Sequence, residues 1–308
     1  MRSAFSAAIV AAAQADPKVL LLTGDHGYAL FDEFRRTCPA QFINCGVAET
    51  NMVGVAAGLA KAGFKPIVYG LACFVPIRTL EQIKLDVCYE ELPVVFIGDG
   101  AGLVYSALGS SHQAAEDIAA LRAVPHIDIL SPCDGEEMQY AMAHALQFAR
   151  PVYVRMGKSD VGTVHTAPVA VPAGDLVPVR AGAGSRAYIA TGSMVVSALR
   201  LAESVDGDAP VWSVPVIKPI NVRQVEDIAA RFDQLVVLEE HNRLGGLGGA
   251  IAEIVAGMRG ARAHVLRLGI DDRFSQFNGT WEYLRREHGI DFDALRAQVL
   301  QSQPQGQP

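Results

Sequence analysis

Strand-like and helix-like segments alternate regularly through residues 1–155, and this pattern leaves few folds open to the chain. Short runs rich in Val, Ile and Leu are followed by longer segments whose apolar residues recur at helical spacing. The expected strands are Val19–Leu22, Gln41–Ile43, Pro66–Tyr69, Val94–Ile97, Asp128–Leu130 and Val152–Val154. The expected helices are Ala4–Gln14, Thr50–Lys61, Pro76–Tyr89, Ala114–Ala123 and Gly135–Phe148. Such alternation predicts a doubly wound α/β domain with a parallel sheet, whose ligands bind at the carboxyl ends of the strands.

A second alternating unit follows a stretch of about 156–185 that is rich in Gly, Pro and Ala and lacks long periodicity. Its expected strands are Tyr188–Ala190, Ala209–Val214, Leu235–Leu238 and His264–Arg267, and its expected helices are Val195–Ser204, Val222–Arg231 and Gly248–Ala256. The sequence therefore predicts two doubly wound α/β domains with mostly parallel sheets, at 1–160 and 186–308. Residues 161–185 are the predicted linker, and the polar tail from about residue 300 is expected to be disordered.

The composition limits the classes of binding partner and the cellular compartment that we expect for the chain. The formal net charge of the 308 residues is −7 with no basic run, which argues against nucleic acid or an anionic membrane surface as the main partner. No apolar run approaches the length of a membrane span, and the first residues predict an amphipathic helix better than a signal peptide. The five cysteines show no CxxC pair and no metal-site spacing, as expected for reduced thiols in the cytoplasm; they are Cys38, Cys45, Cys73, Cys88 and Cys133.

One carboxylate stands at the head of an apolar segment, FINCGVAETNMVGVAAGLAKAG, which covers Phe42–Gly63. The segment predicts a strand end, a turn and a helix of small residues that another helix or subunit can approach closely. Glu49 opens this helix, and the next charged residue is Lys61. The helix dipole favours an acid in the first turn, which explains Glu49 without a function. A buried carboxylate without a partner is costly, however, so a functional role stays open.

This stretch resembles the pyrimidine-binding domain of transketolases, in which G-[VI]-x-E-x-x-M precedes a small-residue helix and a strand. The similarity continues in the family's order through LACFVPIRTLEQIKLDV, LGSSHQAAEDIAALRAVPHIDILSPCD, VIKPIN, VVLEEHNRLGGLGGAIAEI and GIDDRF. It covers nearly the whole chain, from Arg2 to about Leu295, and a collinear series of this length is far more specific than one motif. The resemblance implies a transketolase pyrimidine-binding domain followed by a transketolase C-terminal domain.

The resemblance also implies a cofactor, thiamine diphosphate, bound across a subunit interface with Mg²⁺ that the partner chain mainly holds. Glu49 matches the glutamate that shares a proton with the aminopyrimidine, which requires a carboxyl group in a dry site. Phe74 matches the aromatic residue that stacks on the pyrimidine, although a core Phe gives the same pattern. Leu71 and Ile77 replace other aromatic residues, so aliphatic contacts are expected there. Asp25, in TGDHG, matches the polar residue that closes on the cofactor, and a simple turn Asp is the alternative.

Three further residues concern the substrate, which the resemblance implies to be a sugar or a sugar phosphate. His112, in GSSHQ, matches the family's active-site histidine, which bonds substrate oxygens and moves a proton; a lone surface histidine is the alternative. Arg2 and Lys158 match cations that receive the sugar phosphate, and each is equally explained as a solvated surface charge.

Two departures from the family pattern affect the substrate contacts. YSALGSSHQ is one residue longer than the usual GEDGxTHQ, and Leu108 takes the place of the acid that reads the hydroxyl next to the acceptor aldehyde. Gly98 replaces the usual histidine after the preceding strand. Because buried hydroxyls without partners are penalised, we expect a substrate that is less hydroxylated or differently held.

The segment IGDGAG, at Ile97–Gly102, contains the start of the metal–diphosphate motif of thiamine enzymes. That motif needs an Asn roughly thirty residues later, and no Asn occurs between Asn51 and Asn221. The segment is therefore expected to be a strand-end turn, and no metal ligand is assigned to the chain. A second possible anion site is EEH at Glu239–His241, before a Gly-rich helix start, although a strand-end turn explains it as well.

Because the chain begins where the pyrimidine domain begins, the first expectation is one subunit of a two-chain transketolase, an α2β2 assembly with an N-terminal subunit that carries the diphosphate-binding domain. Such an enzyme moves a two-carbon ketol, or an acyl unit, from a ketose or 2-oxo acid to an aldehyde or keto sugar. Three alternatives stay open. They are acyl transfer from pyruvate as in deoxyxylulose-phosphate synthase, the beta subunit of a 2-oxo-acid dehydrogenase, and a regulatory or scaffolding homodimer without catalysis.

Overall fold

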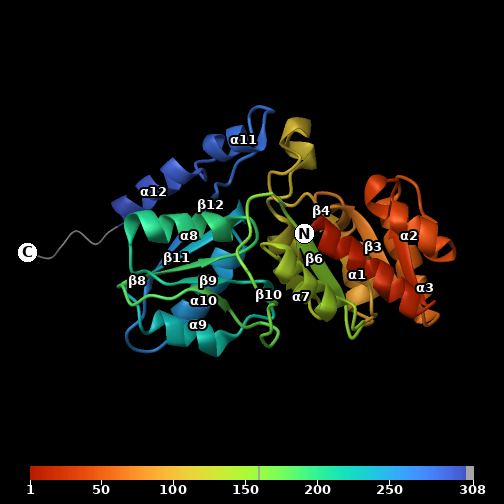
Figure 1. The fold of residues 1–308 in the computed structure, drawn as a ribbon, viewed down its shortest axis with the longest axis horizontal. Coiled ribbons are helices and arrows are strands. Elements are labelled where there is room, and N and C mark those ends of the chain that lie inside the picture. The colour runs from red at the N-terminus through yellow and green to blue at the C-terminus, as the bar shows by residue number, and fades with distance from the viewer. Residues whose placement is uncertain (159, 303–308) are drawn as a thin grey trace, which may run out of the picture.

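The computed structural model describes residues 1–158 and 160–302, which form two α/β units side by side (Figure 1). The first unit contains a seven-stranded sheet with the order β10-β5-β6-β4-β3-β1-β2. All neighbours in it are parallel except β10, which runs antiparallel to β5. Its strands are β1 (Val19–Thr23), β2 (Phe42–Asn44), β3 (Lys65–Leu71), β4 (Val95–Asp99), β5 (Asp128–Leu130), β6 (Val152–Met156) and β10 (Val216–Lys218).

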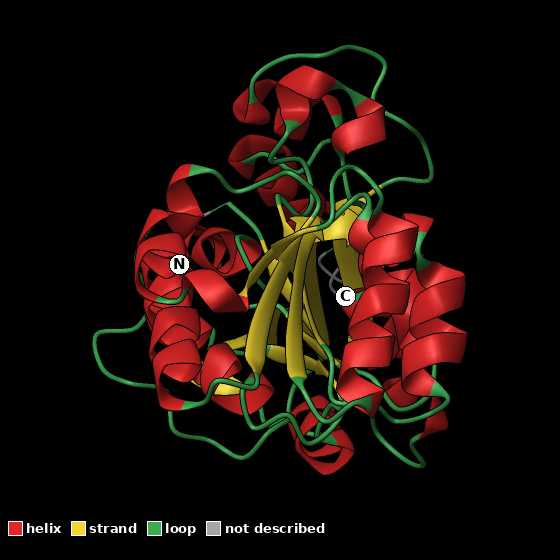
Figure 2. Cartoon of the chain, turned by 90° about the vertical axis from the view of Figure 1, so that its right-hand side faces the viewer, coloured by secondary structure: helices red, strands yellow, loops and turns green. Residues whose placement is uncertain are grey.

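Helices cover both faces of this sheet (Figure 2). The strands are mostly apolar because both faces are covered, and β1, β4 and β6 are buried at every position. The helices are α1 (Arg2–Ala15), α2 (Asp32–Thr37), α3 (Glu49–Lys61), α4 (Val75–Arg78), α5 (Leu80–Gln82), the π-helix η3 (Ile83–Cys88), α6 (Asp117–Arg122) and α7 (Gly135–Ala145). Short 3₁₀ turns are η1 (Ala29–Phe31), η2 (Pro39–Gln41), η4 (Ser106–Leu108) and η5 (Ser110–His112).

The second unit contains a five-stranded sheet with the order β12-β11-β8-β9-β7. Its parallel strands are joined by one antiparallel edge strand, β7. Its strands are β7 (Val177–Arg180), β8 (Arg186–Ala190), β9 (Val211–Ser213), β11 (Gln234–Asn242) and β12 (His264–Ile270), and its helices are α8 (Met194–Val205), α9 (Val222–Ala229), α10 (Leu247–Gly257), α11 (Trp281–Glu287) and α12 (Phe292–Gln301). The predicted fold class, two doubly wound domains with mostly parallel sheets, is confirmed.

The boundary between the two units is less simple than the predicted linker. Strand β7 lies inside the stretch expected to be a linker and pairs with β9. Strand β10 comes after β9 in the chain but joins the first sheet through β5. One apolar core, with Leu121 and Ile129 of the first unit and Ile189 and Leu247 of the second, runs across the boundary. The two units are therefore packed on each other by buried apolar surface, which is the main stabilising term in folding.

Several predicted elements differ in detail from the structure. The single helix expected at Pro76–Tyr89 is broken into α4, α5 and η3. The break falls at Thr79, whose hydroxyl donates a hydrogen bond to the carbonyl of Val75 and so competes with regular helix bonding. The tail expected to be disordered from about residue 300 contains the end of α12 at Gln301, and residues 303–308 lie outside the described residues. Across residues 1–158 and 160–302, every helix is too short or too polar to cross a membrane.

Candidate active site

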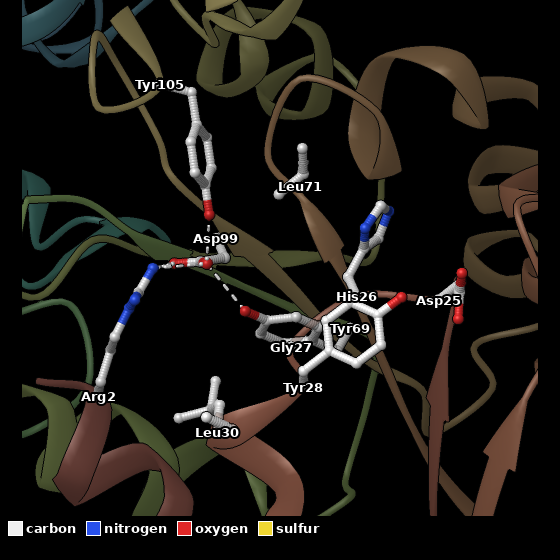
Figure 3. A pocket seen from close by; sticks show the side chains of 11 residues that line it. Arg2, Asp25, His26, Gly27, Tyr28, Leu30, Tyr69, Leu71, Asp99 and Tyr105 are labelled. Carbon is white, nitrogen blue, oxygen red and sulfur yellow. Dashed lines mark hydrogen bonds and ion pairs between the residues drawn. The ribbon is translucent and has the colours of Figure 1, made fainter. Parts of the chain in front are cut away.

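The carboxyl ends of β1, β3 and β4 meet the start of α1 around a pocket of about 380 Å³ (Figure 3). This is the edge of the sheet where ligands of doubly wound domains bind. Residues from the carboxyl ends of these three strands and the loops after them converge there. The side chains that line the pocket are Arg2, Asp25, His26, Tyr28, Leu30, Tyr69, Leu71, Asp99 and Tyr105.

Glu49 lies at the first position of α3 with 2% of its surface exposed. The chain reaches it through an Asx turn, in which Gly46, at a φ of +69°, donates its N–H to Asn44 Oδ1 at 2.9 Å. One carboxylate oxygen, Oε2, accepts a hydrogen bond from Arg78 Nη1 at 2.8 Å. The other, Oε1, lies 3.8 Å from His26 Nε2, and neither of these two atoms has a hydrogen-bond partner among the described residues. Two buried polar atoms thus face one another with their bonding capacity unused.

The electrostatics of Glu49 reflect this pairing. Burial acts to raise the pKa of Glu49, but its own backbone N–H, the hydrogen bond from Arg78 and the charges of Arg78 and His26 outweigh burial and hold the pKa below its usual value. In the chain as it stands, Glu49 is therefore an ionised carboxylate. The partner that neutralises it, Arg78, is 46% exposed at the side chain, so the pair lies at the rim of a protein surface.

Arg78 and Phe74 together link Glu49 to His112. The guanidinium carbon of Arg78 lies 4.0 Å from the centre of the Phe74 ring, a cation–π contact. On another side, the ring of His112 contacts Phe74 edge-on with centroids 5.2 Å apart. His112 is held by its neighbour Ser111, whose Oγ is 3.0 Å from His112 Nδ1. The structure thus brings together Glu49, Phe74 and His112, which the sequence had placed in one site.

Asp99 organises the far side of the pocket. It is 3% exposed and accepts hydrogen bonds from the hydroxyls of Tyr69 and Tyr105, each at 2.8 Å, and from Arg2 Nη2 at 3.0 Å. Figure 3 shows these three donors converging on the one carboxylate. Burial and the charge of Asp99 raise the pKa of both tyrosines, so both stay protonated donors. Arg2 therefore lines the pocket as expected, but its charge is already paired with Asp99.

The remaining predicted residues are spread more widely. Leu71 lines the pocket, and Ile77 is half-buried one residue before Arg78 in α4. Asp25 is exposed at a φ of 64° and accepts a hydrogen bond from Asn44, so it faces the turn before α3 and not Glu49.

Leu108 and Lys158, like Glu49, Phe74, Ile77 and His112, are not among the side chains that line the pocket of Figure 3. Leu108 is 54% exposed in η4. Lys158 pairs with Asp160 at 3.0 Å and lies beside Trp281 of α11, where it lines a smaller cavity shared with α8. Arg2 and Lys158, predicted to receive one phosphate, therefore line different cavities.

Three residues of the site were not singled out from the sequence. His26 is the neighbour of Asp25 in TGDHG, and it is His26 that faces Glu49. Arg78 and Asp99 form contacts between segments far apart in the chain, so no local pattern pointed to their roles. The Glu49–Arg78 pair has only a weak signal in the sequence, because Arg78 is the first cation after Lys65.

Glycines explain why this site departs from the family pattern near β4. A Cβ on Gly98 would lie 2.3 Å from the hydroxyl of Tyr153, which donates to buried Asp117 at 2.8 Å. Any larger side chain at position 98 is therefore excluded while Tyr153 keeps its place. Gly100, at a φ of +77°, makes room for the ring of Tyr105 in the same way. The GDG sequence is a strand-end turn, as predicted, and its Asp99 is the acceptor described above.

The possible anion site at the start of α10 is already filled by the chain itself. Glu239 accepts hydrogen bonds from the backbone N–H groups of Leu247 and Gly248 at 2.7 and 2.9 Å. Glu240 accepts one from the backbone of Leu103 in the first unit, at 2.9 Å. The EEH segment therefore joins the two units, and the anion-site interpretation is wrong because a buried carboxylate takes the N–H groups.

Comparison with known proteins agrees with this geometry. Residues 1–163 match the family model described as transketolase, pyrimidine binding domain, and residues 185–294 match the model described as transketolase, C-terminal domain. The chain belongs to the transketolase family.

Relatives within the transketolase family include both split and undivided enzymes. One subunit of the apulose-4-phosphate transketolase of Phocaeicola vulgatus is 33% identical over 266 residues, which cover 83% of each chain. A solved structure described as split gene transketolase, inactive beta4 tetramer, is 30% identical, has a TM-score of 0.86 and is covered over 97% of its length. The 1-deoxy-D-xylulose-5-phosphate synthase of Oleidesulfovibrio alaskensis is 35% identical over 306 residues, but the chain spans only 47% of that synthase. The two relatives of matching length are thus described as a subunit of a transketolase and as a split gene transketolase.

The transketolase family is dependent on thiamine diphosphate, and the residues present fit its aminopyrimidine. The unpartnered Oε1 of buried Glu49 and the unpartnered Nε2 of His26 offer an acceptor and a second hydrogen-bonding atom to a polar ring. The ring of Phe74 offers an aromatic surface next to them, at present in contact with Arg78. A polar aromatic ring would satisfy the buried atoms that this chain leaves without partners.

Proposed function

We propose that this chain is the pyrimidine-domain subunit of a two-chain, thiamine diphosphate-dependent transketolase. The observation that carries the proposal is the buried carboxylate of Glu49, which has one unpartnered oxygen and is linked through Arg78 to Phe74, whose ring contacts His112. A buried, unsatisfied carboxylate is costly to a fold and is typical of a functional site.

Each residue then has a defined task. Glu49 holds a proton at Oε1 in exchange with the aminopyrimidine, while bound thiamine diphosphate supplies the carbanion chemistry of the reaction. Phe74 orients the pyrimidine by stacking. His112 lies at the rim of the site, where it can hydrogen-bond a substrate oxygen and move a proton. Leu71 and Ile77 keep the walls aliphatic and exclude water.

The diphosphate group and Mg²⁺ are assigned to a partner subunit that carries the diphosphate-binding domain, in an α2β2 heterotetramer. Two observations support this: relatives of matching length are named as one subunit of a transketolase, and a structure of such a chain alone is described as inactive. The five cysteines are all free thiols, which supports a cytoplasmic location.

We assign to the enzyme the transfer of a two-carbon ketol unit in carbohydrate metabolism, between a ketose and an aldehyde. Two relatives are named for apulose 4-phosphate, which makes that sugar phosphate the first donor to test. Arg2 is already paired with Asp99. We therefore expect that a substrate phosphate bound by Arg2 would also lie close to the carboxylate of Asp99.

The test is reconstitution. The chain alone should show no ketol transfer, and the chain mixed with its partner subunit, thiamine diphosphate and Mg²⁺ should transfer a two-carbon unit from the ketose to an aldehyde. Mass analysis of the product separates the outcomes. Addition of two carbons supports the proposal, whereas pyruvate-dependent product would indicate the synthase reaction, and ketose cleavage by the chain alone would overturn the split-enzyme assignment.

A further inference from the structure

A buried cluster lies away from the cofactor pocket, where the first unit meets the connection to the second. Cys133 follows β5 and is 1% exposed, and Glu137 lies in α7 with no exposed surface. His165 comes from the connection and is 11% exposed at the side chain. One ligand atom from each of the three lies within 4.8 Å of the other two. Ser213, at the end of β9, lies beside Cys133 and Glu137.

The cluster contains polar atoms that nothing in the described chain satisfies. Glu137 Oε2 accepts the backbone N–H of Cys133 at 2.8 Å, but Oε1 has no hydrogen-bond partner among residues 1–158 and 160–302. The same is true of His165 Nε2, which lies 3.7 Å from Glu137 Oε1. Leaving such buried atoms unsatisfied costs about 1–3 kcal/mol each. Two unsatisfied atoms facing each other beside a thiol indicate that a bound group completes the site.

The histidine is already oriented. Asp134, the N-cap of α7, accepts the backbone N–H groups of Val164 and His165 at 2.9 and 2.7 Å, and its Oδ2 is 3.2 Å from His165 Nδ1. In the neutral imidazole whose Nδ1–H is donated to Asp134, Nε2 carries the free lone pair. A carboxylate that fixes a histidine in this way is the usual support of a metal-bound imidazole.

We propose that Cys133, Glu137 and His165 bind a structural Zn²⁺ ion. Thiolate, carboxylate and imidazole are the ligand types that this cation takes. The separation of 3.7 Å between His165 Nε2 and Glu137 Oε1 is close to the roughly 3.5 Å between ligand atoms of a tetrahedral zinc site. The sulfur of Cys133 lies beside the same imidazole ring, 3.9 Å from its Nδ1. The fourth ligand would be a water molecule or the buried, unpartnered Oγ of Ser213.

Binding of the ion would release the thiol proton of Cys133 to solvent, because the thiolate is the form that binds a metal. The site joins two elements of the first unit to the connection, so the ion would fix the connection on α7. The ligands come from segments about thirty residues apart, which is why spacing in the sequence gave no metal motif.

The test uses the full-length chain purified without a metal-affinity column. We expect about one equivalent of zinc per chain by elemental analysis, and a thiolate-to-cobalt absorption band when Co²⁺ replaces zinc. His165→Gln, on the surface-lying connection, and Cys133→Ser should each lose the band and at least about tenfold in Co²⁺ affinity. Cys88→Ser, which removes a buried thiol in η3, is the matched control and should leave both unchanged.

Circular dichroism of each variant separates loss of metal from loss of fold. Wild-type protein that binds Co²⁺ no more tightly than folded His165→Gln, or binds it without the sulfur band, would overturn the proposal. The cluster would then be an imidazole–carboxylate ion pair only.

Discussion

Glu49→Gln removes an acid from the most buried part of the proposed cofactor site and leaves the shape of the side chain unchanged. The amide oxygen of Gln can still accept the hydrogen bond from Arg78, so the contact at 2.8 Å can survive. Because Arg78 is half-exposed, losing the charge of the pair costs little stability, about 0–1 kcal/mol. Helix α3 begins at the same residue and keeps its buried apolar side. We therefore expect the variant to fold and to assemble with its partner.

The loss should appear in proton transfer. Gln cannot hold or release a proton at the position of Oε1, so the whole general acid–base contribution disappears, typically about 10²–10⁴-fold in rate. Cofactor affinity should fall much less, since the diphosphate and metal contacts are assigned to the other subunit. The expected pattern is a folded complex that binds thiamine diphosphate but barely activates it.

The assay is exchange of the thiazolium C2 proton with D₂O in the assembled complex, followed by NMR. The matched control is Glu253→Gln, which removes the carboxylate of another Arg–Glu pair, with Arg122, at an exposed position of α10. The control should exchange at the wild-type rate. Wild-type exchange in Glu49→Gln, with cofactor bound, would show that Glu49 is only an acid favoured by the helix dipole and would refute the site assignment.

Three further predictions address specificity, cofactor entry and pH. Leu108→Asp should raise the ratio of the rates for a hydroxylated acceptor and its deoxy analogue by about fivefold, which corresponds to about 1 kcal/mol. This is the low end for a new hydrogen bond, because Leu108 is exposed. An unchanged ratio would contradict the placement of this loop. Arg78→Met should tighten cofactor binding about two- to fivefold, as measured by calorimetry, because an ion pair with Glu49 worth up to about 1 kcal/mol no longer has to be broken. Weaker binding would mean that Arg78 holds the cofactor. Burial outweighs the two backbone donors and raises the pKa of Glu239 to about 7. The stability of wild type relative to Glu239→Gln is therefore greatest below pH 4.5, the pKa of the unfolded chain, and should be lost as the pH rises through 7. Melting temperatures of the two proteins that shift in parallel across this pH range would contradict the prediction.

The sequence predicted most of the fold because its strongest signals are local. Runs such as Val19–Thr23 are buried at every position and almost entirely apolar, and α3 has the apolar spacing of a helix packed against a sheet. The edge strands β7 and β10 were missed because each has only three or four residues and pairs antiparallel with a partner distant in the chain. Nothing within such short segments distinguishes them from a loop.

In the candidate site, too, residues in local motifs were found from the sequence, and residues that act through distant contacts were not. Glu49, Phe74 and His112 lie in motifs, so the resemblance identified them and the structure brings them together. Asp99 was not recognised, since its three donors come from α1, from β3 and from the loop after β4, and only the folded chain unites them. Arg2 lines the pocket, and the sequence could not show that Asp99 pairs its charge.

The contacts of Arg78 connect cofactor entry to the state of Glu49. Arg78 both neutralises Glu49 and covers part of the Phe74 ring, so a pyrimidine that stacks on the covered face has to displace it. Once Arg78 leaves, the forces that hold the pKa of Glu49 low are weakened while its burial remains, and desolvation then raises the pKa toward a proton-sharing state. The carboxylate would thus become basic enough to hold a proton only when the ring it serves is in place. In the free chain the same residue stays ionised and paired, which avoids the cost of an unpaired buried charge.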